Sequence, residues 1–375
     1  MNLFYHYVNQ WYRNRLALDR LLYCQIHVTK RCQNQCAHCY FRELSSTCYD
    51  MPLKELIELI ETIRIRADKL SLISRIDFTG GDPLLYPFIN QVAEACNLEG
   101  IPYGFKCNPE SIITKNEQLR HVMEMCSGIS LSIDGLPNTH DSIRGDGSFD
   151  NTLKAIEILK DSGIQLKIST TVSYDNVGDL IPLMEFLRHE RILVDDFTWA
   201  RYWSISHRDK IISAVDMMQV FEELCDYYES VFSDSSFYVR LSDGRVVPQI
   251  MIGFKEHQWY PFFVKKGIIA SDLQRDISSR PNCINCTATK HYYIIDPDFS
   301  VYKCRKLPET KIDLETLGTQ EGVGFCNSNL VECMKCIYYN ACGGCAAISK
   351  CLAESMLKAE PLCPYRTQKT DKPNL

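Results

Sequence analysis

The sequence lacks any apolar run long enough to cross a bilayer, and residues 1–16 lack the apolar stretch and small-residue cleavage site of a secretory signal. It also lacks an excess of positive charge, since 41 Lys and Arg stand against 47 Asp and Glu, a formal net charge of -6. A protein that neutralises a nucleic-acid backbone needs such an excess. We therefore expect a cytoplasmic protein that has neither a membrane nor a nucleic acid as partner.

The composition excludes disorder and collagen-like structure. Hydrophobic residues make up 45% of the 375 positions and charged residues 23%, which is ordinary for a globular chain that buries a core. Cysteine is the unusual feature, with 19 residues. Because reducing compartments do not favour structural disulfides, metal binding is the natural explanation.

The cysteines form two groups and a scattered set. Ten lie between Cys283 and Cys363, and three form the CxxxCxxC spacing of Cys32, Cys36 and Cys39. The other six stand singly and are expected to be small buried hydrophobic residues: Cys24, Cys48, Cys96, Cys107, Cys126 and Cys225.

Short apolar runs alternate with amphipathic stretches over residues 21–240, which predicts repeated strand-helix units and a parallel sheet. The expected fold class is α/β, a partial barrel of six such units followed by a small cysteine-rich domain whose core is metal. The expected strands are 21–28, 74–79, 102–107, 128–134, 165–172 and 194–203. The expected regions are an N-terminal extension (1–20), the barrel (21–240), a connecting region (241–280) and the cysteine-rich domain (281–375).

The CxxxCxxC loop directly follows the first expected strand, at the carboxyl end where such barrels place their chemistry. Three thiolates can hold three irons of a cubane and leave the fourth iron without a protein ligand. Zinc is the alternative for closely spaced cysteines, although three cysteines with no fourth nearby suit a structural zinc site poorly.

With its cysteine loop and two further motifs, the sequence resembles the radical S-adenosylmethionine (radical SAM) superfamily over nearly the whole chain. The segment DFTGGDPLL matches the family's glycine-rich element, whose backbone binds the methionine amino group. The segment ISLSIDGLPNTHDSIRGDG matches peptide-modifying members. The resemblance implies that S-adenosylmethionine docks on the open iron and is reductively cleaved to a 5'-deoxyadenosyl radical. The implied cofactor-binding residues are Tyr40, Gly80, Gly81, Asp82, Pro83, Asn108, Ser132, Asp134 and Arg144.

The resemblance also implies a role for several of these residues, from the positions that they occupy in the family's motifs. Tyr40 is implied near the adenine, Ser132 at the ribose and Arg144 at the methionine carboxylate, with Asp134 as a polar neighbour. The alternative for the segment from Ser132 to Arg144 is a strand followed by a polar turn. For Asn108 the alternative is a turn former before a proline.

The C-terminal segment resembles the SPASM extension, which holds two auxiliary [4Fe-4S] clusters. The hairpin HYYIIDPDFSVYKC and the run CMKCIYYNACGGC carry this resemblance, although the glycine of the family's hairpin is Phe299 here. Cys326 and Cys351 are left over, and zinc ribbons are the alternative for paired CxxC units. By position, the implied ligands are Cys283, Cys286, Cys304 and Cys345 for the first auxiliary cluster and Cys333, Cys336, Cys342 and Cys363 for the second.

The resemblance thus implies three [4Fe-4S] clusters, S-adenosylmethionine and a reductant such as flavodoxin or ferredoxin. The expected reaction is oxidation of a ribosomally made peptide, by a carbon–carbon or carbon–sulfur cross-link or a related oxidation. Because only about 20 residues precede the first strand, a separate protein or the barrel itself is expected to recognise the peptide leader. No residue is identified as the general base.

Two other functions stay open. A sulfatase-maturing enzyme forms formylglycine, but members of that kind place an aspartate after the hairpin cysteine, where this chain has Arg305. A non-catalytic iron-sulfur or zinc module for electron transfer or scaffolding is the alternative from another class, and it would not need the Gly80-Gly81 element, Ser132 or Arg144.

Overall fold

The computed structural model describes residues 2–41, 49–160, 162–204, 206–280, 283–286, 290–319, 330–353, 360 and 362–365. Cys48 and Cys326 lie outside the described residues.

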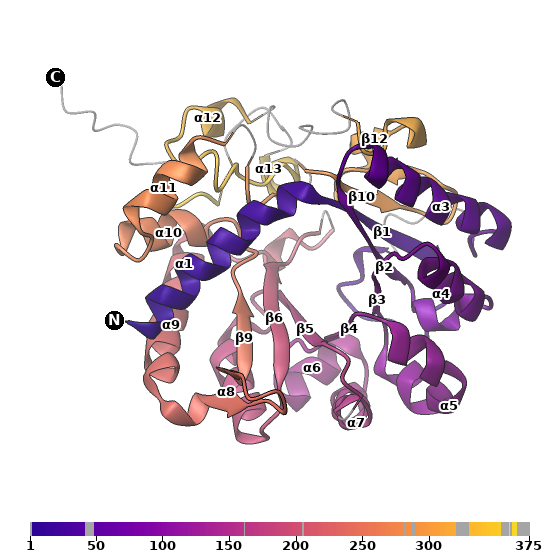
Figure 1. Ribbon diagram of the computed structural model, residues 1–375. Coiled ribbons are helices and arrows are strands. Elements are labelled where there is room, and N and C mark those ends of the chain that lie inside the picture. The colour runs from indigo at the N-terminus through magenta and orange to yellow at the C-terminus, as the bar shows by residue number, and fades with distance from the viewer. Residues whose placement is uncertain are drawn as a thin grey trace.

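One curved sheet forms the centre of the molecule, with strand order β12-β11-β10-β1-β2-β3-β4-β5-β6-β9 (Figure 1). Neighbouring strands from β10 through β1 to β6 and β9 are parallel, whereas β10, β11 and β12 pair antiparallel. This is the predicted α/β partial barrel. The barrel strands are β1 (Leu21–Thr29), β2 (Ile73–Gly80), β3 (Tyr103–Lys106), β4 (Ile129–Ser132), β5 (Leu166–Val172) and β6 (Val194–Arg201).

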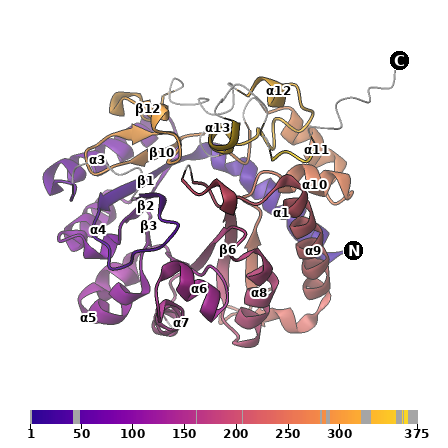
Figure 2. The same cartoon turned by 180° about the vertical axis from the view of Figure 1, so that it is seen from behind.

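Helices cover the outer surface of the sheet (Figures 1 and 2). In the first of the crossover helices, Leu56, Ile60 and Ile63 recur at helical spacing and are completely buried, which explains why this segment forms a helix against the sheet. The crossover helices are α3 (Leu53–Lys69), α4 (Ile89–Leu98), α5 (Pro109–Met125), α6 (Pro137–Arg144), α7 (Ser148–Leu159), α8 (Leu180–His189) and α9 (Ala214–Ser233).

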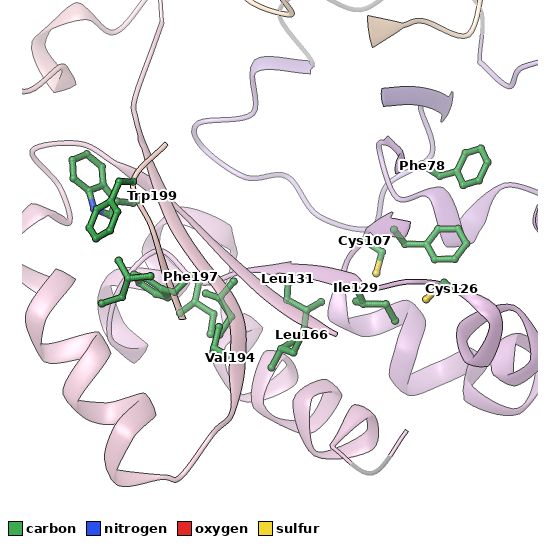
Figure 3. Packing of buried hydrophobic residues seen from close by; sticks show 14 of the residues in the cluster. Phe78, Cys107, Cys126, Ile129, Leu131, Leu166, Val194, Phe197 and Trp199 are labelled. Atoms are coloured by element: carbon green, nitrogen blue, oxygen red, sulfur yellow. The ribbon is translucent and has the colours of Figure 1, made fainter. Parts of the chain in front are cut away.

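Residues alternate between the two faces of the barrel strands. In β5 the residues Leu166, Ile168 and Val172 are buried under the helices, while Lys167 and Ser169 between them are only half-buried. Figure 3 shows the helix-covered side, where Leu131, Leu166 and Phe197 pack together and the sulfur atoms of Cys107 and Cys126 lie among apolar side chains. The polar face therefore points into the barrel lumen. As expected, the five described single cysteines are buried.

Segments beyond the six units extend the sheet at both edges. The expected connecting region supplies β9 (Ile250–Gly253), which pairs with β6. The hairpin of β10 (Tyr292–Ile295) and β11 (Val301–Tyr302) adds to β1 on the other side, and β12 (Lys311–Ile312) follows it. The remaining elements are α1 (Leu3–Leu16), the separate pair β7 (Tyr238–Arg240) and β8 (Val246–Pro248), α10 (Trp259–Lys265), α11 (Ser271–Ser278), α12 (Val331–Met334) and α13 (Ala346–Ala353).

The hairpin turn keeps a backbone shape that glycine favours, although its residue is Phe299. The φ angle of Phe299 is 62°, in the left-handed region. Phe299 therefore occupies a conformation that glycine would adopt at lower cost.

The N-terminal helix α1 runs beside α9 and leads into β1 (Figure 1). Tyr7 of this helix donates a hydrogen bond to the Ile252 carbonyl of β9 at 2.8 Å, and Arg13 pairs with Asp272 of α11 at 2.6 Å. The helix thus bridges the edge strand β9 and the segment that precedes the cysteine-rich part. None of the described helices combines the length and apolar character needed to span a bilayer.

Candidate active site

The CxxxCxxC loop leaves the carboxyl end of β1 and is held by backbone contacts on two sides. The amides of Gly81 and Asp82 donate to the carbonyls of Thr29 at 2.8 Å and Arg31 at 2.6 Å. On the opposite side, the Ala37 amide donates to the last turn of α6 at 2.8 Å. The loop is therefore fixed between the ends of β2 and α6.

Glycine is required where β2 meets this loop. A Cβ on Gly81 would lie 2.2 Å from the Arg31 carbonyl oxygen, and one on Gly80, whose φ is 126°, would lie 2.3 Å from that of Thr29. Since both approaches are to backbone atoms, no side-chain movement could relieve them. Because an ammonium group only donates hydrogen bonds, the backbone carbonyl oxygens of this turn are the atoms that could accept one from it.

Asp82 lies under the loop and does not face solvent. Its carboxylate is completely buried and accepts hydrogen bonds from the Ser111 hydroxyl at 2.6 Å and the Leu84 amide at 3.1 Å. Burial raises the pKa of Asp82 to about 6, although these hydrogen bonds act to lower it. Pro83, also buried, begins the short turn that follows. Asp82 and Pro83 therefore shape the turn.

Two nitrogen donors point at cysteine sulfur atoms. The Asn108 side-chain amide lies 3.2 Å from Cys32 Sγ, and the Arg144 guanidinium lies 3.8 Å from Cys36 Sγ. Burial raises the pKa of both thiols, and the amide and the guanidinium charge oppose that rise. Because both donors stabilise thiolates, this donor set fits a cluster that binds the cysteines in their thiolate form.

Arg144 is anchored by a buried carboxylate. Its Nε donates to Asp134 Oδ2 at 2.5 Å, and Asp134 is completely buried. The other carboxylate oxygen accepts the Thr171 amide at 2.7 Å. The His38 ring of the loop lies 3.4 Å from Arg144 Nη2, and burial lowers the pKa of His38 to about 4. Ser132 is half-buried at the end of β4, two residues before Asp134.

The aromatic residue after the third cysteine faces the hairpin. The guanidinium of Arg305 lies 5.1 Å from the centre of the Tyr40 ring. His27 of β1 lies 3.4 Å from the Tyr40 hydroxyl and 2.7 Å from Asp296 of the hairpin. One small pocket is lined by these residues together with Cys304. The CxxxCxxC loop and the predicted auxiliary region thus meet here.

The four cysteines assigned to the second auxiliary cluster line one small cavity of about 40 Å³, which also includes Glu360. These are Cys333, Cys336, Cys342 and Cys363.

The cysteines assigned to the first auxiliary cluster lie nearby in two pairs. Cys304 and Cys345 flank Lys306, while the Cys286 amide donates to Cys283 Sγ at 3.4 Å. Arg15 of α1 faces this second pair, and its Nε is buried without a hydrogen-bond partner among the described residues. An anionic cluster on these thiolates would pair with that guanidinium. Cys351 is buried and donates to the Ser204 carbonyl.

No three His, Cys, Asp or Glu side chains in the described part of the chain are close enough to share one ion.

Sequence reasoning missed Glu360, which joins the cysteine-rich part to the barrel. This buried carboxylate pairs with Arg201 of β6 at 2.5 Å and with His257 at 2.8 Å, and it accepts the Cys345 amide at 2.8 Å. These charges hold its pKa well below the usual range although burial opposes them. The only available signal was its position three residues before Cys363.

Comparisons with known proteins agree with this architecture. Residues 26–187 match the model of the radical SAM superfamily. An AdoMet-dependent heme synthase of Oleidesulfovibrio alaskensis is 24% identical over 361 residues, which cover 91% of this chain and 87% of that protein. The antilisterial bacteriocin subtilosin biosynthesis protein AlbA of Bacillus subtilis is 23% identical over 182 residues, which cover 48% of this chain and 39% of that protein.

Two solved structures share the fold. Native anSMEcpe with bound AdoMet and Kp18Cys peptide has a TM-score of 0.68 at 16% identity, covering 93% of this chain and 95% of that one. Streptococcus suis SuiB bound to precursor peptide SuiA has a TM-score of 0.63 at 16% identity, covering 96% and 79%. Together with the cysteine loop, these findings show that residues 26–187 form a radical SAM domain, which uses S-adenosylmethionine and a [4Fe-4S] cluster, in a chain that has the fold of the two solved structures.

Proposed function

We propose that this enzyme oxidatively modifies a ribosomally made peptide, by a carbon–carbon or carbon–sulfur cross-link or a related oxidation. The contact of Arg305 with Tyr40 at 5.1 Å carries the proposal. Tyr40 directly follows the cysteine loop, and Arg305 directly follows Cys304, an expected auxiliary-cluster ligand. The contact therefore supports an auxiliary cluster beside the radical site, where it can accept the electron that an oxidised substrate gives up.

Bound together, S-adenosylmethionine and the [4Fe-4S] cluster supply a 5'-deoxyadenosyl radical for hydrogen abstraction. In this proposal the thiolates of Cys32, Cys36 and Cys39 hold the cluster. Backbone carbonyls of Gly80 and Gly81 accept hydrogen bonds from the methionine ammonium group.

The remaining contacts to S-adenosylmethionine come from side chains around the cysteine loop. Arg144 faces the methionine carboxylate, Ser132 the ribose and Tyr40 the adenine. Asp134 and Asn108 act through their neighbours, because their polar groups are engaged with Arg144 and Cys32.

Two auxiliary [4Fe-4S] clusters belong to the proposal. The cavity lined by four cysteines supports the second, and Arg15 beside Cys283 and Cys286 supports the first. The ligands proposed are Cys283, Cys286, Cys304 and Cys345 for the first cluster and Cys333, Cys336, Cys342 and Cys363 for the second.

A peptide substrate is supported by the names of similar proteins. AlbA is named for the biosynthesis of a bacteriocin, and the two solved structures are described with a peptide bound. The similarity to a heme synthase over 91% of the chain favours a tetrapyrrole as the second candidate substrate. Formylglycine formation ranks below both, because the half-buried Arg305 lies over Tyr40 where an aspartate base would be needed.

The test uses anaerobically reconstituted enzyme with S-adenosylmethionine, dithionite and peptides encoded beside its gene. Flavodoxin or ferredoxin is the proposed reductant in the cell, and a separate protein is the proposed leader-recognition partner. We expect 5'-deoxyadenosine together with a peptide that has lost two hydrogen atoms. Accumulation of 5'-deoxyadenosine with every peptide mass unchanged would count against a peptide substrate.

A further inference from the structure

A row of polar side chains crosses the lumen face of four neighbouring strands. Lys106 of β3 is in register with Ser130 of β4, Ser130 with Lys167 of β5, and Lys167 with Asp196 of β6. Residues in register on adjacent parallel strands point to the same face of the sheet. All four are half-buried, unlike the buried apolar residues that alternate with them under the helices.

The row carries an excess of positive charge. Asp196 pairs with Lys255 at 3.0 Å, and Asp77 of β2 pairs with Arg75 at 3.2 Å. Each of these carboxylates is thus balanced by one cation, and the ammonium groups of Lys106 and Lys167 add two further positive charges. The aliphatic part of Lys167 packs over Gly128, where an added Cβ would lie 3.3 Å from Lys167 Cε.

Lys106 has capacity for a further acceptor. Its ammonium group donates one long hydrogen bond, 3.3 Å to Gln25 Oε1, and lies 3.9 Å from Asp77 Oδ2. An ammonium group has three donors. Gln25 Oε1 also accepts a stronger hydrogen bond from the Tyr292 hydroxyl at 2.6 Å. Although strands surround it, the Lys106 side chain remains 34% exposed, as expected for a group that lines an open lumen.

The row is close to the radical site. The ring of Tyr292 stacks on that of Tyr23, with 4.9 Å between the ring centres. The positive charge of Arg305 acts on the Tyr292 hydroxyl, and the same guanidinium lies over the ring of Tyr40. A substrate that reaches Tyr40 therefore has Lys106 within the same lumen.

We propose that Lys106 binds a carboxylate group of the substrate inside the barrel, with Lys167 two strands away adding to the positive charge of the same face. A carboxylate is the ligand that an ammonium group with unused donors favours, since it accepts a charge-assisted hydrogen bond from that group. The inference rests on the proposed function in assigning this carboxylate to an acidic residue of a peptide. A tetrapyrrole carboxylate has the same chemistry, and the experiment distinguishes the two.

The test measures how fast Lys106 is acetylated by an N-hydroxysuccinimide ester in reconstituted enzyme with S-adenosylmethionine, using mass spectrometry. Burial lowers the pKa of Lys106 to about 8, which favours its reaction. The probes are N-acetyl-L-glutamate and its neutral counterpart N-acetyl-L-glutamine, both with the α-carboxylate blocked as the methylamide, and coproporphyrin III. Lys54, whose side chain is 83% exposed on α3, is the internal control.

We expect N-acetyl-L-glutamate to slow Lys106 acetylation about threefold at a concentration about twice its Kd, by mass action. N-acetyl-L-glutamine should have no effect, and Lys54 should react equally in every sample. The Lys167→Gln variant should show weaker protection of Lys106. The iron content and the S-adenosylmethionine binding of this variant are measured as the control for its folding. Equal rates with the acid and the amide would overturn the carboxylate site.

Because this readout needs no turnover, it is independent of the peptide assay. Protection by coproporphyrin III and not by N-acetyl-L-glutamate would support the carboxylate site and contradict the peptide substrate. A peptide that loses hydrogen while neither acid protects Lys106 would support the proposed function and overturn this inference.

Discussion

Arg144 Nε donates to Asp134 Oδ2 across 2.5 Å, and the carboxylate has no exposed surface. The pair connects the end of β4 to the last turn of α6, next to Cys36. A structural ion pair and two contacts with the cysteine loop thus share one guanidinium, since Nη1 and Nη2 are turned toward Cys36 and His38.

Arg144→Gln should lower the free energy of unfolding by about 3–5 kcal/mol, because it leaves Asp134 buried without its cation. It should also abolish S-adenosylmethionine binding. Adding Asp134→Asn should restore part of the stability and none of the binding, as measured by urea denaturation and equilibrium dialysis under anaerobic conditions. Purely additive losses in the double variant would show that the two residues are not coupled.

Gly81→Ala should displace the cysteine loop, because the added Cβ would approach the Arg31 carbonyl to 2.2 Å. We expect the N-terminal cluster to lose iron. We also expect S-adenosylmethionine to bind at least about tenfold more weakly, which is a change of about 1.4 kcal/mol in the free energy of binding. Gly178→Ala is the matched control, since its Cβ would meet nothing within 4 Å. Equal iron content and affinity in both variants would contradict the fit of the loop.

His140 should make stability depend on pH. It accepts a hydrogen bond from the Asp134 amide at 3.0 Å, and burial, aided by the charge of Arg144, lowers its pKa to about 4. Between pH about 6.5 and 4 the unfolded chain binds a proton that the folded chain does not, so stability falls as pH falls, by up to about 3 kcal/mol.

His140→Asn keeps an acceptor for the Asp134 amide and removes this titration. Unfolding midpoints at several pH values should therefore fall less steeply toward acid in the variant than in the unmodified protein. Parallel curves would mean that His140 is protonated equally in both states.

Glu360→Gln should destabilise the junction of barrel and cysteine-rich part by about 3 kcal/mol, because it leaves Arg201 buried with one carboxylate fewer. Auxiliary iron should become more accessible to a chelator, since the Cys345 amide loses a charged acceptor. Glu309→Gln breaks an exposed pair with Lys350 at 2.5 Å and should change stability by less than about 1 kcal/mol. Chelation at equal rates in the two variants would contradict this role of Glu360.

The strands were predictable because their apolar alternation and flanking turns are local features of the sequence. All six lie at most two residues from their expected bounds. The position of the cysteine loop followed from topology, since a parallel barrel gathers the carboxyl ends of its strands. The four-residue strand β9 carried too short a pattern to be recognised, and it lies in the expected connecting region.

Contacts between distant segments were not predictable. Arg201 and Glu360 are 159 positions apart, and no local signal pairs them. The row formed by Lys106 and Lys167 depends on the register of neighbouring strands, which the sequence does not state. Tyr40 was assigned from the family, but its contact with Arg305 required the hairpin to pair with β1.

The central claim is that one iron of the cluster on Cys32, Cys36 and Cys39 binds S-adenosylmethionine in place of a fourth protein ligand. Electron–nuclear double resonance on the dithionite-reduced enzyme, with the cofactor labelled at its amino nitrogen, tests this directly. We expect a coupling between that nitrogen and the cluster, absent when the three cysteines are replaced by Ala. A reduced cluster that shows no coupling to the bound cofactor, or a lone zinc at this loop, would contradict the account.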